Sequence, residues 1–303
     1  MDWLDEELDL YDVGFLHRND LKGLHYKYRR RVSDIPGFRS RTTEISGGQE
    51  YNFDGRVTTS GYTAKRYYQF HNHNDMKLEL KYLPERWDDR NSVGYGDFRI
   101  EDRWAGEIGF GTDGAKILSM FAQLELINED LGGLSQEADL SIRFIPTDRL
   151  DLRLKIEYKN RDGWLLHVGE GDFTTYEAEQ WTPRLDANVF LSANQQIRAV
   201  LQWVGVKAKE QKFYSVPEGG GDLIPRVKLP GADSDDFTIS NLVFQFRYKW
   251  EIAPLSDLYI VYTRGGSIYQ AGTDEDFSSL LSDTYSDPIA ELFVVKLRYR
   301  FGG

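Results

Sequence analysis

The chain ends with the stretch ELFVVKLRYRFGG, residues 291–303, in which apolar and charged side chains alternate. Every second residue from Phe293 is apolar, and cations occupy the positions between them from Lys296 onward. Because successive side chains of a β-strand point to opposite faces, this pattern predicts a strand with one apolar and one cationic face. The apolar set is Phe293, Val295, Leu297, Tyr299 and Phe301, and the cations are Lys296, Arg298 and Arg300.

The same alternation recurs in segments 76–82, 138–144, 150–159 and 242–250, each with apolar residues on one face and charged or polar residues on the other. Segments of about 9–12 residues match tilted strands that cross a bilayer, whereas soluble strands average about five or six residues. A wide membrane barrel turns its apolar residues to lipid and its charged residues to a watery interior. The sequence therefore predicts an all-β fold, an antiparallel transmembrane β-barrel of about 12–14 strands.

The expected connections alternate between short and long, as in outer-membrane barrels with short periplasmic turns and longer external loops. An acidic N-terminal segment, residues 1–19, is expected to precede a β-barrel domain at residues 20–303. The expected short turns are 71–75, 111–114, 146–148, 192–195 and 253–257, and the expected long loops lie near 86–102, 160–176, 209–236 and 264–289.

Composition removes several classes of protein. The net charge of −12 argues against nucleic acid as a partner, because nucleic-acid binders carry a basic footprint. The sequence has no cysteine, so disulfides and thiol ligands are excluded. No apolar run approaches the roughly 18 residues that a membrane helix needs. The acidic start, MDWLDEELDLYDVGF, lacks signal-peptide features, which leaves either a cytoplasmic chain or a mature piece of an exported one.

Strand parity adds a further expectation. The last strand is expected to run down to the periplasm, and about thirteen strands precede or include it, so the first strand would start on the outside. Single-chain bacterial barrels instead have both ends in the periplasm. We therefore expect one of two situations. Either the chain is the C-terminal part of a larger barrel, or the weakly patterned region 37–70 contains a different number of strands than the pattern indicates.

The charged face is the candidate site. A ring of cations from several strands would favour anionic solutes. The alternative is that acids on the same strands, among them Glu79, Asp139, Asp151, Glu157 and Asp186, pair with the cations and fill the interior. The predicted interior-facing cations are Arg143, Arg153, Lys155, Arg247, Lys249, Arg298 and Arg300.

The sequence predicts no catalytic, cofactor-binding or metal site. His71 and His73 lie in an Asn-rich turn, which forms for backbone reasons and needs no metal. His167 is expected in a long loop near Glu170 and Asp172, and would be the general base if the barrel were a hydrolase; no nucleophile is evident beside it.

Three stretches carry a resemblance to known proteins. VVKLRYRF, residues 294–301, resembles the terminal aromatic signal by which the assembly machinery recognises outer-membrane barrels; the signal residues would be the five apolar residues from Phe293 to Phe301. YDVGFLHRND (11–20) and SDLYIVYTRG (256–265) resemble blocks of a barrel family of unknown function, in which the barrel follows an N-terminal carbohydrate-binding module of the family-9 type.

The resemblance implies a bacterial outer-membrane location, with lipid, lipopolysaccharide, the assembly machinery and an upstream carbohydrate-binding module as partners. The predicted function is an outer-membrane pore or membrane anchor linked to surface carbohydrate binding or handling. Two alternatives remain at this point: an outer-membrane hydrolase acting on lipid or peptide at the barrel rim, and a soluble β-barrel that binds an apolar ligand.

Overall fold

The computed structural model describes residues 2–4 and 19–301, which form an all-β structure with one short helix. This confirms the all-β prediction. The strands of the large sheet are β1 (Asp2–Leu4), β2 (Leu21–Ile35), β3 (Phe38–Tyr51), β4 (Val57–Gln69), β5 (Asp75–Leu83), β8 (Arg103–Gly111), β9 (Leu118–Asn128), β10 (Leu134–Thr147), β11 (Leu150–Gly169), β12 (Asp172–Ser192), β13 (Gln195–Ser215), β15 (Ile224–Arg226), β16 (Phe237–Ala253), β17 (Ser256–Ala271) and β18 (Ala290–Arg298).

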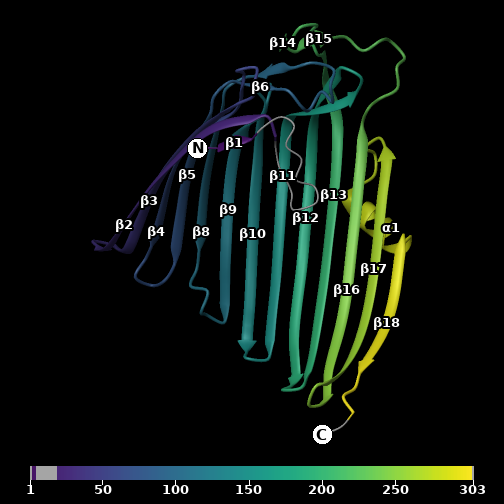
Figure 1. Cartoon of the computed structure of the whole chain (residues 1–303). Coiled ribbons are helices and arrows are strands. Elements are labelled where there is room, and N and C mark those ends of the chain that lie inside the picture. Colours follow the sequence, from purple (N-terminus) through teal and green to yellow (C-terminus); the bar gives the residue numbers. More distant parts are fainter. Residues whose placement is uncertain (1, 5–18, 302–303) are drawn as a thin grey trace.

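Within the described ranges the large sheet has 15 strands, and the neighbours along its main path pair antiparallel in sequence order. β15 pairs with β13 beside that path. The weakly patterned region 37–70 contributes two long strands, β3 and β4. The five turns that the sequence predicts to be short lie at one end of the sheet, at the bottom of Figure 1.

The sheet curves strongly but is open in the part of the chain that the structure describes. β2 and β18 lie near its two ends, and the pairing order does not join them (Figure 1). The antiparallel sheet of the prediction is therefore present, whereas a closed ring is not seen among the described residues. Alternation along a strand reports which residues share a face, but it carries no information on which strands are neighbours.

The central strands are longer than the sequence predicts. β11, β12 and β13 have 20, 21 and 21 residues, so most of the predicted long loop 160–176 is sheet, closed by a turn at Glu170 and Gly171. His167 consequently lies in β11 and not in a loop. A β-bulge between Asp162 and Trp164 shifts the side-chain phase here and hides the period of two.

A small sheet lies at the end of the molecule with the longer connections. It consists of β6 (Arg86–Asp88), β7 (Phe98–Ile100) and β14 (Gly221–Asp222), of which β14 and β7 are parallel. Phe98 and Ile100 are buried against Phe173 of β12 and its neighbours on β11 and β13. The connection between β5 and β8 therefore crosses this end of the sheet to reach β11–β13.

The helix α1 (Phe277–Ser286) packs on β13, β16 and β17. Leu280 is fully buried against Trp203 and Leu242. A Cβ at Gly266 would lie 2.0 Å from the carbonyl oxygen of Thr284, so only glycine permits this close approach. Among the described helical residues, none forms a helix long and apolar enough to cross a membrane.

Candidate functional site: the charged concave face

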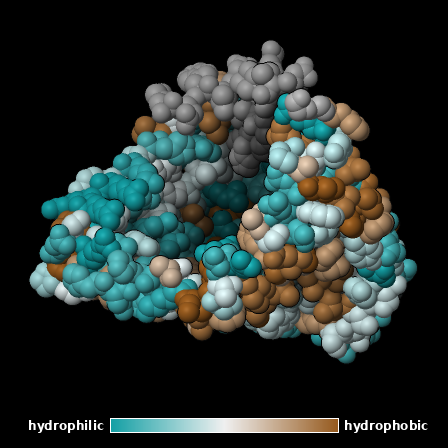
Figure 2. All heavy atoms as spheres, turned by 90° about the horizontal axis from the view of Figure 1, so that it is seen from below, coloured by the Kyte–Doolittle hydropathy of each residue, from teal (hydrophilic) through white to brown (hydrophobic). Residues whose placement is uncertain are grey.

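The two faces of the large sheet differ in chemistry. We call the charged face the one that carries Glu79, Glu107 and Glu125, which lie in one register row across β5, β8 and β9. The opposite face, the apolar face, carries Leu78 and Ile108 at adjacent positions. Viewed from the short-turn end, hydrophilic residues line much of the hollow, and hydrophobic residues gather on the right-hand part of the outer surface (Figure 2). The charged face is thus the concave one.

Acids and bases on β4, β5 and β8 form one network on this face. Lys77 Nζ lies 2.5 Å from Glu107 Oε1 and 3.0 Å from Glu79 Oε2. Lys65 Nζ reaches the same Glu79 oxygen at 2.8 Å. Both carboxylates are almost fully buried, with side chains 7% and 5% exposed, so the ammonium groups replace the water that these acids have lost.

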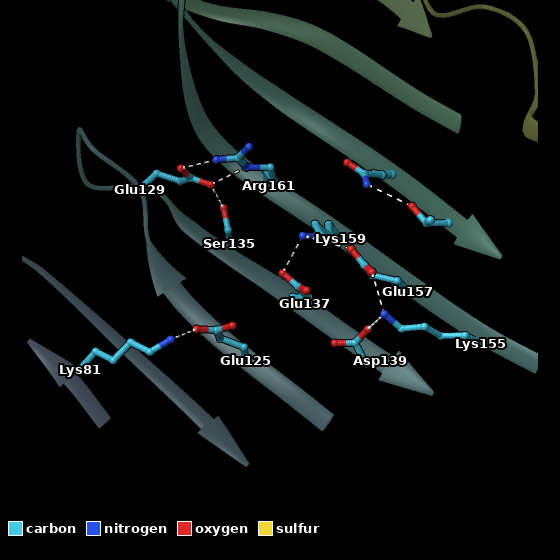
Figure 3. Close-up of polar contacts among 12 residues, drawn as sticks. Lys81, Glu125, Glu129, Ser135, Glu137, Asp139, Lys155, Glu157, Lys159 and Arg161 are labelled. Carbon is cyan, nitrogen blue, oxygen red and sulfur yellow. Dashed lines mark hydrogen bonds and ion pairs between the residues drawn. The ribbon is translucent and has the colours of Figure 1, made fainter. Parts of the chain in front are cut away.

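A second network joins β10, β11 and the turn after β9 (Figure 3). Arg161 donates from Nε and Nη2 to the two oxygens of Glu129 at 2.8 and 2.9 Å, a bidentate geometry. The hydroxyl of Ser135 donates to Glu129 Oε1 at 2.6 Å. Lys159 Nζ lies 3.1 Å from Glu137 and 3.2 Å from Glu157. Positive and negative charges therefore alternate across these strands.

Four of the predicted interior cations have carboxylate partners. Lys155 contacts Glu157 at 3.3 Å and Asp139 at 3.8 Å. Lys249 and Arg298 share the buried Asp257, with Lys249 Nζ 3.5 Å from Oδ1. The fourth ion pair joins Arg143 Nη2 to Asp151 Oδ2 at 2.7 Å.

The other three predicted cations, Arg153, Arg247 and Arg300, form no ion pair within the described ranges. Arg247 donates to Gln245 Oε1 at 3.4 Å, and the backbone N–H of Arg300 donates to Ser256 Oγ at 3.0 Å. Arg300 also lies beyond the end of β18 at Arg298. The structure places the predicted row up to Arg298 on one face but not in one continuous ring of free charge.

Arg198 is a cation that the sequence reasoning missed. It lies directly opposite Arg247 in the β13–β16 register, an arrangement that is destabilising unless something compensates the like charges. Arg198 and Arg153 also line a recess of about 180 Å³ together with Asp151 and Asp186. The sequence does not tell which residue lies opposite Arg247 on the neighbouring strand, so Arg198 was not predicted as part of the cationic row.

His167 and His73, the histidines weighed as a base and as a metal ligand, contact a backbone carbonyl oxygen and an arginine. His167 Nε2 lies 2.6 Å from the backbone carbonyl oxygen of Glu170, and Asp172 pairs with Arg226 instead. His73 Nδ1 lies 3.0 Å from Arg39 Nη1. The other described contacts of His167 are with the rings of Tyr95 and Phe173, and a serine or threonine hydroxyl is not among them, so the geometry gives the hydrolase alternative no support.

The polarity of the faces reverses along the longest strands. On β11 the apolar face carries Leu152, Leu154, Ile156 and Tyr158 but continues with Asn160. On the other face, above the charged rows, Tyr176, Ala178, Ala208 and Phe237 form a buried apolar cluster. The reversal occurs near the contact between Tyr158 and Trp181, whose ring centroids are 4.6 Å apart. A second aromatic contact, Tyr82 with Trp104 at 4.6 Å, lies on the apolar face of β5 and β8.

Charges beyond this reversal are held by local partners. Burial lowers the pKa of Lys228, but hydrogen bonds to Glu210 at 2.6 Å and Asp235 at 3.0 Å outweigh it, so the pKa is raised overall. Lys228 therefore stays protonated and ties the loop after β15 to the end of β13.

The fold and site define an all-β protein whose large curved sheet has a charged concave face and an apolar outer face. The chain matches the family described as "Domain of unknown function (DUF5916)" over residues 1–301 and belongs to that family. This confirms the expected membership in a family of unknown function. No curated protein matches the chain.

Proposed function

We propose that this chain forms the wall of a transmembrane β-barrel in the bacterial outer membrane. The reversal of face polarity along β11–β13 carries the proposal. Below Tyr158 and Trp181 the outer face is apolar and the inner face is charged; above them the outer face is polar and the inner face is packed. A soluble sheet has no reason to change its apolar side partway along a strand, whereas a strand that leaves a bilayer does.

The aromatic contacts support the same orientation. Trp and Tyr concentrate at membrane–water interfaces, and the Tyr158–Trp181 and Tyr82–Trp104 pairs lie where the outward apolar stripes of their strands end. Short turns at the opposite end would then lie in the periplasm, with the small sheet and the longer connections outside.

The function that this wall supports best is the passage of small solutes through the barrel. If the interior is blocked, the barrel would serve only as a membrane anchor. The paired acids and bases fill much of the charged face, so we expect selectivity to come from the cations that form no direct ion pair. Arg198 and Arg247, opposite each other, would favour anions. The proposed link to surface carbohydrate binding rests on the family resemblance alone.

The same proposal names the partners. Outer-membrane lipid and lipopolysaccharide would cover the apolar face, and the assembly machinery would recognise the exposed apolar residues of the last strand. An upstream carbohydrate-binding module is the expected further partner. Closure of the open edges would be part of assembly, because unpaired edge groups are not tolerated in lipid.

Conductance in a planar bilayer tests the proposal. We expect single-channel currents with anion preference, and Arg198→Gln with Arg247→Gln should reduce that preference while channels still form. Lys155→Gln, which removes a paired cation, is the matched control and should change selectivity less. A protein that inserts but never conducts would contradict the pore and leave the anchor. A protein that stays monodisperse without detergent would contradict the membrane assignment itself.

A further inference from the structure

The apolar face carries three arginines that do not fit a purely hydrocarbon-facing surface. Arg30 on β2 and Arg66 on β4 flank Thr43 of β3 in one register row, and Arg41 lies two residues along β3 from Thr43. The same row continues through Leu78, Ile108, Leu124 and Ala138 on the following strands, which are apolar. The arginines are therefore on the outer side of the sheet, opposite the networks described above.

These three arginines have no carboxylate partner in the described ranges. Arg30 and Arg66 are exposed, and the buried Nε of Arg41 has no hydrogen-bond partner. The neighbouring cations on the charged face differ: Lys27 pairs with Glu44 at 2.9 Å, and Arg31 donates to Ser40 Oγ at 3.4 Å. Ionisable residues that face a bilayer are costly and usually have a partner and a role.

A groove adjoins the arginines on the same face. It has a volume of about 950 Å³ and is lined by Thr43 and Arg66 at one end and by Leu78, Leu80 and Leu124, among others, beyond them. Small residues open its floor, since a Cβ at Gly106 would meet no atom within 4 Å. Its size is within the range of ligand sites, and its mostly apolar lining reaches Arg66, the one arginine of the three that borders it.

The cluster lies toward the short turns, where the head groups of one leaflet would be. Arg41 is three residues from the start of β3, and Arg66 is three residues from the end of β4. Tyr68 and Phe38, whose ring centroids are 4.9 Å apart at that end, are the type of aromatic pair found at a membrane interface. Guanidinium groups bind phosphate oxygens through paired hydrogen bonds, so a phosphate here would satisfy the arginines.

We propose that Arg30, Arg41 and Arg66 with this groove bind an anionic phospholipid, its phosphate on the guanidinium groups and an acyl chain along the groove. This inference rests on the proposed membrane location of the apolar face. Charge complementarity favours an anionic lipid over a second copy of the chain. If two copies met through this same face, each would place its three cations against the three cations of the other.

The test is lipid binding to the full chain in a nonionic detergent, with bound lipids counted by native mass spectrometry. We expect dioleoylphosphatidylglycerol to bind about tenfold more tightly than dioleoylphosphatidylcholine, and glycerol 3-phosphate to bind far more weakly than either. Raising the salt concentration should reduce the preference. Equal binding of the two lipids by the wild type, or equal binding of the chainless head group, would overturn the proposal.

A matched pair of variants locates the site. Arg30→Gln with Arg66→Gln should abolish the preference for phosphatidylglycerol. Arg29→Gln with Arg31→Gln removes the same charge from the same region but on the charged face, and should keep the preference. Equal loss in both variants would show general charge attraction and overturn the site. If the first double variant does not fold, Arg66→Gln alone is expected to lower the preference.

Failure of the proposed barrel is a separate observation. Heat-dependent migration on a gel and insertion into phosphatidylcholine vesicles report the membrane fold without reference to anionic lipid. A chain that inserts but shows no lipid preference would contradict only the arginine site. A chain that does not insert would contradict the proposed function.

Discussion

The lower and upper halves of β11–β13 have opposite chemistry although each strand is continuous. In the lower half the outward side chains are apolar and the inward ones form ion pairs; in the upper half Asn160, Glu177 and Glu179 share the outward face, and Phe237 packs inside. Antiparallel pairing continues through both halves, and the outward face is already polar at Asn160, before the first bulge of β11 at Asp162/Trp164, so loss of strand pairing does not explain the change. The difference teaches that the surroundings of the sheet, not its topology, select the side chains on each face.

The largest expected effect is in the packed upper half. Phe237→Ala removes a ring that contacts Tyr176 and Trp164, with centroid distances of 5.3 and 6.2 Å, from the buried cluster. We expect the free energy of unfolding to fall by about 3–5 kcal/mol. Phe246→Ala, on the outward face of the lower half, is the control and should cost about 1 kcal/mol in lipid, where no buried cavity forms. Urea unfolding in vesicles measures the free energy of unfolding of both variants. Equal losses would contradict the assignment of a packed upper half and a lipid-facing lower half.

The second largest expected effect comes from placing a positive charge on the outer face of β11, once in its lower half and once in its upper half. Leu154→Arg, in the middle of the outward apolar stripe of β11, should cost about 2–4 kcal/mol in a bilayer, and Asn160→Arg on the same face about 0–1 kcal/mol. The measurement is the unfolding free energy of each variant in phospholipid vesicles. If Asn160→Arg were the more damaging change, the assignment of the two halves would be reversed.

Breaking the inner ion-pair network should have a moderate effect. Glu129→Gln removes the bidentate partner of Arg161, and we expect a loss of about 1–3 kcal/mol, because the remaining guanidinium is only partly exposed to water. Glu137→Gln is the matched control and should cost less, since its partner Lys159 keeps Glu157 at 3.2 Å. Chemical denaturation of both variants compares them, and an unchanged Glu129→Gln midpoint would contradict the structural role of the pair.

The smallest effect concerns the attachment of α1 at low pH. The hydroxyl of Ser278 and the N–H of Ser279 donate to the Asp276 carboxylate and lower its pKa from 3.8 to about 2. Because the folded pKa is depressed, this cap is fully stabilising above pH 3.8 and is lost as the pH falls toward 2. Fluorescence of Trp203, buried under α1, should change over that interval. Asp276→Asn, which caps without titrating, should remove the transition.

The sequence was most informative where the pattern stayed in phase. The alternation from Phe293 and from Leu150 predicted the strands and their faces, and residues of the predicted cationic row up to Arg298 lie on the charged face. The conduction role of that row remains a prediction. The upper extension was missed because bulges at Asp162/Trp164 and Thr175/Tyr176 shift the phase just where the polarity also reverses.

Features that depend on neighbouring strands were not predictable from one chain. The Arg198–Arg247 contact and the row Arg30–Thr43–Arg66 exist only through register. α1 was predicted as part of a loop, because its ten residues are mostly small and polar, and burial of Leu280 and Thr284 against the sheet stabilises them as a helix. The predicted segment 1–19 lies mostly outside the described residues, although Asp2–Leu4 pair with β2.

Lipid contact at single positions of β11 tests the central claim most directly. The sequence has no cysteine, so Leu154→Cys, Lys155→Cys and Asn160→Cys each give one labelling site. In vesicles that contain brominated phospholipid, a fluorophore at residue 154 should be strongly quenched, and fluorophores at 155 and 160 should not. Equal quenching at 154 and 155, or none at 154, would contradict a sheet whose lower outer face meets lipid and whose inner face does not.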